Sequence, residues 1–231
     1  MNLKRTLLAT AVLVAGLGGA PAFAELMPIT GFYFGALGGQ ADYGQSRGRF
    51  NEIVVLSIED AGLTFVDGVS EIDNEDIGFG AFAGYRIWDY FAIEALYLDL
   101  GEMQYDADTT VSAGGPNFPA NFQLTQNISG PALSLVGILP FDGPWEVYAR
   151  AGMVFGDTEF CARVSLDGVQ GDAFCDSESG EETLAGVGFA FHIGDHISLR
   201  AEYTKVFDVG SESDNMEEDV NFLNLNFLWR L

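Results

Sequence analysis

Hydrophobic and polar residues alternate along most of this chain. The pattern is clearest in its last segment, NFLNLNFLWRL, where Leu223, Leu225, Phe227, Trp229 and Leu231 alternate with Asn224, Asn226, Leu228 and Arg230. Successive side chains of a β-strand point to opposite faces, so this period of two predicts a strand with one apolar face. No polar tail follows it, which the fold has to explain.

Eight segments carry this alternation or a weaker form of it. They are residues 32–43, 78–87, 91–100, a stretch within 122–138, 145–155, 185–193, 197–204 and 221–231. The facing of the first is ambiguous because it is rich in glycine. In the fourth, only ALSLVGIL after Gly130 and Pro131 is a clear strand, since proline interrupts sheet hydrogen bonding. We therefore expect eight strands.

Short and long connections alternate between these strands. Tight turns are expected at 88–90, 140–144 and 194–196, and long connections at 44–76, 101–121, 156–183 and 208–219. In an antiparallel up-and-down sheet, every second connection lies at the same end. All the tight turns are therefore expected at one end and all the long loops at the other.

The face opposite the large apolar side chains is made of small and charged residues. Its charged members, in mid-strand, are Arg86, Glu94, Glu146, Arg150, Arg200 and Glu202. A soluble sandwich would turn this face to water, whereas a transmembrane barrel points it into the lumen. The glycine content of this face suits a narrow lumen. Aromatic residues stand near strand ends, as in an interfacial girdle: Tyr85, Trp88, Tyr90, Trp145 and Trp229.

The sequence therefore predicts an all-β fold. It is an eight-stranded antiparallel up-and-down transmembrane β-barrel with short periplasmic turns and long extracellular loops. Closure leaves no unpaired strand edge in lipid. The final strand must pair with the first, which explains why the chain finishes on an apolar strand.

The net charge and the N-terminal residues limit the cellular compartments and the classes of partner that the sequence allows. The chain has 34 acidic and 10 basic residues, a formal net charge of −24. Residues 1–24 have a basic start, an apolar run, and Ala22 and Ala24 at the spacing of a cleavage site. We expect a secretory signal peptide there, with an uncleaved anchor as the alternative, and a single barrel domain over 25–231. Cleavage would remove two basic residues and leave −26, a charge that excludes nucleic acid as a partner.

Cys161 and Cys175 are the only cysteines. In an exported chain they favour a disulfide that closes a short loop. A metal pair is the alternative, but no nearby histidine completes a ligand set. We expect no metal and no cofactor.

The segment DIGFGAFAGYRIWDYFAIEALYLDLGE, with GFYFGALGG before it and HISLRAEYTKV near the end, resembles the OmpA-type family of eight-stranded outer-membrane β-barrels. The resemblance spans about 31–231 and implies a Gram-negative outer-membrane location. It implies an interior charge cluster at Glu94, Arg150 and Arg200. It also places Leu135 where well-known members have a lysine in the fourth strand. Phe227, Trp229 and Leu231 resemble the C-terminal signal read by the outer-membrane assembly machinery, which usually ends in phenylalanine.

Eight strands enclose only enough space for side chains, so we expect the inward charges to form a salt-bridge network and not a general pore. The function expected is structural support or adhesin-like surface interaction through acidic loops. The protein would be a monomer among outer-membrane lipid and lipopolysaccharide, with a surface ligand bound by the loops. The acidic loops favour a solvated surface over divalent-cation sites. Within the first loop, residues 51–69 are apolar enough for an extra strand pair or a partner-binding patch.

Two other classes of function remain open. A lipid-modifying enzyme, a deacylase or acyltransferase, would need a histidine beside a serine at the outer-leaflet rim. His192 and His196 flank the turn at 194–196, on the periplasmic side, so we expect no enzyme. A lipocalin-like periplasmic carrier is disfavoured by an outward apolar band.

Overall fold

The computed structural model describes residues 30–209 and 218–231. The expected signal peptide lies outside the described residues, as do Glu212, Asp214 and Glu217 of the fourth acidic connection. Within the described ranges, no helix is both long enough and apolar enough to cross a membrane.

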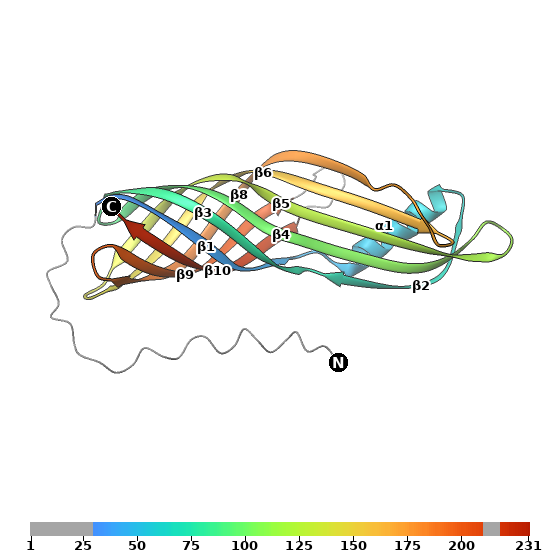
Figure 1. Cartoon of the computed structure of the whole chain (residues 1–231), viewed down its shortest axis with the longest axis horizontal. Helices are drawn as coiled ribbons and strands as arrows, with labels where there is room; N and C mark the ends of the chain where they lie inside the picture. The colour runs from blue at the N-terminus through green and yellow to red at the C-terminus, as the bar shows by residue number, and fades with distance from the viewer. Residues whose placement is uncertain (1–29, 210–217) are drawn as a thin grey trace, which may run out of the picture.

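The described chain is almost entirely strand (Figure 1). Its elements are β1 (Gly31–Tyr43), α1 (Arg47–Asp60), β2 (Thr64–Asp73), β3 (Glu75–Trp88), β4 (Phe91–Ser112), β5 (Asn117–Pro140), β6 (Trp145–Leu166), β7 (Val169–Gln170), β8 (Phe174–Ile193), β9 (Ile197–Val209) and β10 (Glu218–Arg230). Eight strands pair in the order β4-β3-β1-β10-β9-β8-β6-β5, and the pairing of β5 with β4 closes the ring. The predicted eight-stranded up-and-down barrel is confirmed.

The last strand closes the barrel against the first. β10 pairs with β1 in antiparallel register, with Trp229 opposite Phe34 and Leu225 opposite Gly38. Leu225 is 66% exposed on the outer face, whereas Asn226 is 2% exposed in the lumen. β10 is therefore a wall of the barrel, with its apolar side chains on the outer face.

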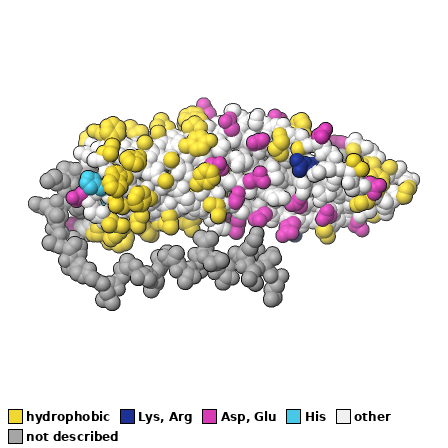
Figure 2. Space-filling view, in the orientation of Figure 1, with side chains coloured by type: hydrophobic (Ala, Val, Ile, Leu, Met, Phe, Trp, Pro, Cys, Tyr) yellow, Lys and Arg dark blue, Asp and Glu magenta, His cyan; other side chains and the backbone are white. Residues whose placement is uncertain are grey.

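The outer face of the ring is an apolar band (Figure 2). The large outward residues predicted from the alternation are exposed, among them Phe79, Tyr97, Val187 and Leu223. The expected girdle residues Tyr85, Trp88, Tyr90, Trp145 and Trp229 are also exposed. The alternating face predicted to be lipid-facing is therefore the outer face of the barrel.

Four strands continue well beyond this band. The sequence predicts loops at 101–121 and 156–183. In the first of these, β4 runs to Ser112 and β5 starts at Asn117. In the second, β6 runs to Leu166 and β8 starts at Phe174. In β4 the continuation is hidden by a bulge between Asp99 and Glu102, where Gly101 has φ 78°. The bulge shifts buried positions from even to odd numbers, so the alternation changes phase there.

The first connection also contains regular structure. β2 pairs with the C-terminal part of β4, as an extra strand in this loop would. Residues 51–60, however, are helix and not strand. Phe50, Val54 and Ile58 are buried at a spacing of four, which places them on one face of α1. We call α1, β2, β7 and residues 102–129 and 157–182 the extension.

The polarity of the fold reverses between the barrel and the extension. In the barrel, apolar side chains face outward and charged ones face the lumen. In the extension, Met103, Tyr105, Phe122 and Ile128 are buried inside, while many acidic side chains are spread over the outside (Figure 2). An interior of apolar side chains under an acidic surface is the arrangement of a water-soluble domain. The outer surface of the extension is therefore suited to water and that of the barrel to lipid.

Candidate functional site

The centre of the lumen is organised around Glu94 of β4, whose side chain is fully buried. Its Oε1 lies 2.6 Å from Nη1 of Arg200 and its Oε2 lies 2.7 Å from Nη2 of Arg150. The Tyr33 hydroxyl donates a further hydrogen bond to Oε1 at 2.6 Å. The carboxylate of β4 thus binds one guanidinium group from β6 and one from β9. The three strands are distant in the sequence.

Glu202 of β9 extends the same network. Its Oε1 lies 3.0 Å from Nε of Arg150, and its Oε2 accepts a 2.6 Å hydrogen bond from the Tyr148 hydroxyl. The guanidinium of Arg200 lies 4.9 Å from the centre of the Tyr148 ring, in cation–π geometry. Two carboxylates and two arginines therefore pair their charges with one another, as buried charges must, although Nε of Arg150 and Nε of Arg200 make no hydrogen bond.

A second cluster lies toward the tight-turn end. Nη1 of Arg86 is 2.8 Å from Oε1 of Glu146, and Nε2 of His192 is 3.0 Å from Oε2. The six predicted lumen residues are thus brought together in two groups of ion pairs, one around Glu94 and Glu202 and one around Glu146. Sequence reasoning identified the charges but not His192, Ser198 and Arg230, which complete the second group; their inward parity was the available signal.

His192 also contacts a serine. Its Nδ1 lies 2.8 Å from Oγ of Ser198, so serine, imidazole and the Glu146 carboxylate form a continuous chain, as in acyl-transfer enzymes. Ser198 is only 1% exposed, however, and Nη2 of Arg230 donates to its Oγ at 2.5 Å. The chain lies at the end opposite the extension. The serine is thus held in a buried hydrogen-bond network and not presented to a substrate.

The rest of the lumen is filled by close contact between walls. A Cβ at Gly35 would lie 2.5 Å from the Phe82 ring, and one at Gly84 would lie 2.4 Å from the Tyr33 ring. Both distances are too short for any side chain, so glycine at these positions makes room for the aromatic rings. The glycine-rich face predicted from the sequence therefore lines a packed interior.

Leu135 requires a correction. The family resemblance places it at an inward position, but its side chain is 64% exposed on the outer face. Ser134 is the inward residue, 2% exposed, and its register partner on β4 is Glu94. The error is a shift of one residue, which in a strand exchanges the two faces.

The predicted C-terminal signal lies on the outer face of β10. Phe227 and Trp229 are 48% and 40% exposed, and Leu231 is 80% exposed at the chain end. The Trp229 ring stacks on His196 at a centroid distance of 5.9 Å. Recognition of these three residues by the assembly machinery stays a prediction.

The extension has a site of its own where α1 crosses the sheet. The rings of Phe50 and Tyr105 stack at 5.1 Å between centroids, and the Tyr105 hydroxyl donates to Oδ1 of Asn51 at 2.6 Å. Beside this contact, an open groove of about 260 Å³ separates α1 from β2 and β4. The helix is therefore anchored along one side and leaves a recess along the other.

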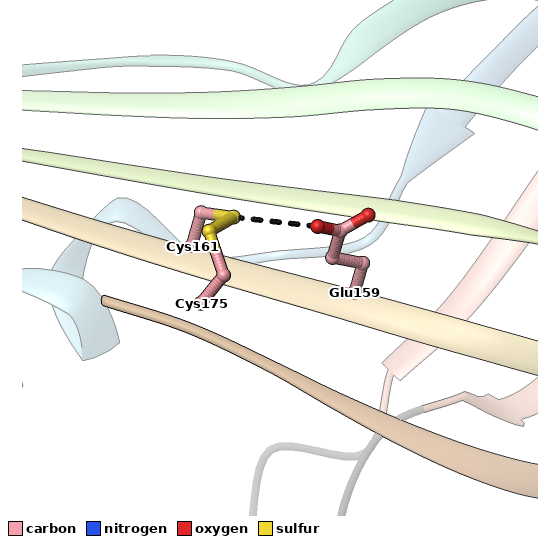
Figure 3. Close-up of side chains that lie close together, drawn as sticks. All are labelled: Glu159, Cys161 and Cys175. Atoms are coloured by element: carbon pink, nitrogen blue, oxygen red, sulfur yellow. Dashed lines mark hydrogen bonds between the residues drawn. A yellow bond between two sulfur atoms is a disulfide. The ribbon is translucent and has the colours of Figure 1, made fainter. Parts of the chain in front are cut away.

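Cys161 and Cys175 form a disulfide across neighbouring strands of the extension (Figure 3). They are register partners on β6 and β8, and Oε1 of Glu159 lies 3.7 Å from Sγ of Cys161. These three side chains are close enough to share a metal ion, but the two sulfur atoms are bonded to each other and are not available as thiolate ligands. The arrangement favours a covalent staple over the metal alternative.

We expect reduction of this disulfide to loosen only the β6–β8 hairpin. The bond closes a loop with a sequence separation of 14, for which chain entropy gives about 3 kcal/mol. Limited proteolysis of the folded protein with and without reductant should show new cleavage confined to 157–182. A Cys161→Ser/Cys175→Ser variant should give the same pattern without reductant, and cleavage within the barrel strands would contradict this assignment.

Acidic side chains cover the outside of the extension. Those exposed are Glu52, Glu59, Asp60, Asp67, Glu71, Asp73, Glu102, Asp108, Asp157, Glu159, Asp167, Asp172, Asp176, Glu178 and Glu181. Of the ten basic residues, Arg47, Arg49 and Arg163 lie in the extension, whereas Arg86, Arg150, Arg200 and Arg230 are buried in the lumen. The described surface of the extension is consequently strongly negative.

Comparison with known proteins identifies the family. The model of the OmpA-like transmembrane domain matches residues 29–231. No curated protein sequence matches the chain. Neisserial surface protein A is similar in structure, with 17% identity, 87% of this chain and 98% of that chain covered, and a TM-score of 0.47. The β-barrel domain of OprF from Pseudomonas aeruginosa has 11% identity, coverage of 87% and 99%, and a TM-score of 0.43. OprG from the same organism has 12% identity, coverage of 87% and 97%, and a TM-score of 0.42. The chain therefore belongs to the OmpA-like transmembrane domain family and is a β-barrel of the outer membrane.

Proposed function

We propose that this protein is a monomeric, non-enzymatic outer-membrane barrel that acts at the cell surface by binding a positively charged partner through the extension. The reversal of polarity between barrel and extension carries the proposal. A barrel that only had to span the membrane could finish in short loops, whereas this chain continues its apolar core beyond the apolar band into a sheet that carries a helix. A rigid scaffold is what a recognition surface requires.

The lumen supports this assignment by its contents. The ion pairs of Glu94, Glu146 and Glu202 and the aromatic rings packed on Gly35 and Gly84 fill the interior. Transport through such an interior would require separating buried charge pairs, which costs several kcal/mol. The buried Ser198 likewise favours a structural role for the Ser198–His192–Glu146 chain over hydrolysis.

The charge of the extension indicates the chemistry of the partner. A dense acidic surface attracts basic surfaces and repels anionic ones such as lipopolysaccharide phosphate. The attraction between exposed charges is screened by salt, with a Debye length of about 8 Å at physiological ionic strength. Binding should therefore be selective for polycations and should weaken as salt is added.

The test uses the whole protein in neutral phosphatidylcholine nanodiscs over immobilised polylysine. We expect binding to polylysine and none to an immobilised polyanion such as dextran sulfate. Neutralising three outward acids on β6 and β8, by Asp157→Asn, Glu159→Gln and Glu181→Gln, should weaken binding about tenfold, because each exposed charge contributes roughly 0.5 kcal/mol.

The matched control removes three acids at the opposite end. Asp89, Asp142 and Asp195 lie in the tight turns, and changing all three to asparagine should leave the affinity unchanged, although the net charge changes equally. Equal losses in both triple variants would show that net charge and not the extension governs binding. Equal affinity of the unmodified protein and both triple variants for polylysine would also overturn the proposal.

A further inference from the structure

The groove beside α1 is lined differently from the packed core around it. Its floor is formed by β2 and β4, where Gly68 pairs with Thr109 and Ser70 pairs with Ala107. These residues are small, and they face Val54 and Val55 of the helix. Larger side chains here would fill the space as they do elsewhere under α1, so the recess follows from the residue types at these positions.

The size of the groove suits a small molecule. A cavity of about 150 Å³ with apolar walls holds a benzene ring, and the groove measures about 260 Å³. It can therefore take one substituted ring or an equally short chain. It is too small for a peptide segment with several side chains, and drug-sized ligands usually occupy larger pockets.

The walls are apolar except at one end. Val54, Val55 and Phe65 supply apolar surface, while Asn51, Ser70 and Tyr105 gather hydrogen-bonding groups. Burial raises the pKa of the Tyr105 hydroxyl, so it remains protonated and donates to Oδ1 of Asn51. The Asn51 amide oxygen thus faces the Tyr105 hydroxyl, and the amide N–H groups of Asn51 serve as donors for a ligand oxygen.

The surroundings select against negative charge. Glu52 on the helix, Asp67 and Glu71 on β2, and Asp106 and Asp108 on β4 adjoin the lining residues in sequence. None of the lining residues is basic. Arg47, one helical turn before Asn51 on α1, acts electrostatically on the Tyr105 hydroxyl, but the acidic residues around the groove outnumber this one cation, so the net charge there still disfavours a carboxylate. The groove is therefore suited to an uncharged molecule.

We propose that the groove between α1 and strands β2 and β4 is a binding site for a small, uncharged molecule with one apolar ring or short chain and one hydroxyl group. The apolar part lies along Val54, Val55 and Phe65, and the hydroxyl contacts Asn51 at the polar end. None of the lining residues belongs to the acidic side chains of the outer surface, and the site does not depend on the role proposed for that surface.

The probe is para-ethylphenol, with ethylbenzene and para-ethylbenzoate as analogues that lack the hydroxyl or add a negative charge. Titration of the whole protein in nanodiscs, followed by amide NMR, should give saturable shifts at Gly68, Ser70 and Ala107. For a ligand of this size we expect a dissociation constant on the order of 0.1–1 mM. Ethylbenzene should bind several-fold more weakly and para-ethylbenzoate at least tenfold more weakly.

Two variants test the site independently. Ala107→Leu fills the groove and should weaken binding at least tenfold, while Ala95→Leu, the same change on the lipid-facing part of β4, should leave it unchanged. Asn51→Leu keeps the apolar walls and should abolish the preference for para-ethylphenol over ethylbenzene. This preference is the ratio of two dissociation constants measured on one variant, so it tests the site even if Ala107→Leu does not fold. Shifts that rise linearly and spread over lipid-facing residues would mean partition into the bilayer only and would overturn the proposal. An unchanged preference in Asn51→Leu would also overturn it.

Discussion

Replacing Glu94 with glutamine should destabilise the folded barrel by about 3–5 kcal/mol, the loss expected when one partner of a buried ion pair is removed. The Glu94 carboxylate lies 2.6 Å from Arg200 and 2.7 Å from Arg150, and it is fully buried. Glutamine preserves the shape but carries no charge. The two guanidinium groups would then repel each other in a site with little access to water.

Urea unfolding of the refolded protein in lipid vesicles, followed by tryptophan fluorescence, measures this loss. Glu71→Gln is the matched control, because Glu71 is exposed on β2 and the same change there should alter the free energy of unfolding by less than about 0.5 kcal/mol. The double variant Glu94→Gln/Arg200→Met should lose less than the sum of its single variants, since the charge left unpaired is also removed. A loss below about 1 kcal/mol for Glu94→Gln would show that water solvates these charges in an open lumen.

The parts of the fold predicted from the sequence are those controlled by the period of two. Alternation located the eight wall strands, although it left the facing of the glycine-rich first strand ambiguous, and the inward parity of Glu94, Arg150 and Arg200 placed them in the lumen. Parity does not reveal which charge meets which, because that depends on the stagger between strands. The pairing of Arg86 with Glu146 and of Arg150 with both Glu94 and Glu202 therefore required the structure.

The extension was harder to predict because its polarity is reversed and its pattern changes phase. After the bulge at Gly101, the buried residues of β4 become Met103 and Tyr105, so one continuous alternation no longer describes the strand. The helix could have been recognised from Phe50, Val54 and Ile58, although the nearby valines and isoleucines also suit a strand. Competing local preferences of this kind are resolved by tertiary packing, here by Tyr105 beneath the helix.

The same reversal explains how one chain meets two solvents. Leu225 on β10 and Val169 on β7 are similarly exposed, at 66% and 72%. Leu225 lies four residues from Trp229 of the girdle, about 13 Å along the strand and near the middle of an apolar band about 25 Å tall. Val169 lies in the extension, where the neighbouring surface is acidic. Exposure alone would assign these two residues the same environment.

The most direct test of the account is therefore to place arginine at each of these positions and measure the free energy of unfolding in lipid vesicles. We predict a loss of about 2–4 kcal/mol for Leu225→Arg, because a charge near the bilayer midplane loses its hydration. We predict a change within about 0.5 kcal/mol for Val169→Arg, because that side chain remains in water. Similar values for the two variants would mean that barrel and extension face the same solvent, and the assignment of one to lipid and the other to water would be wrong.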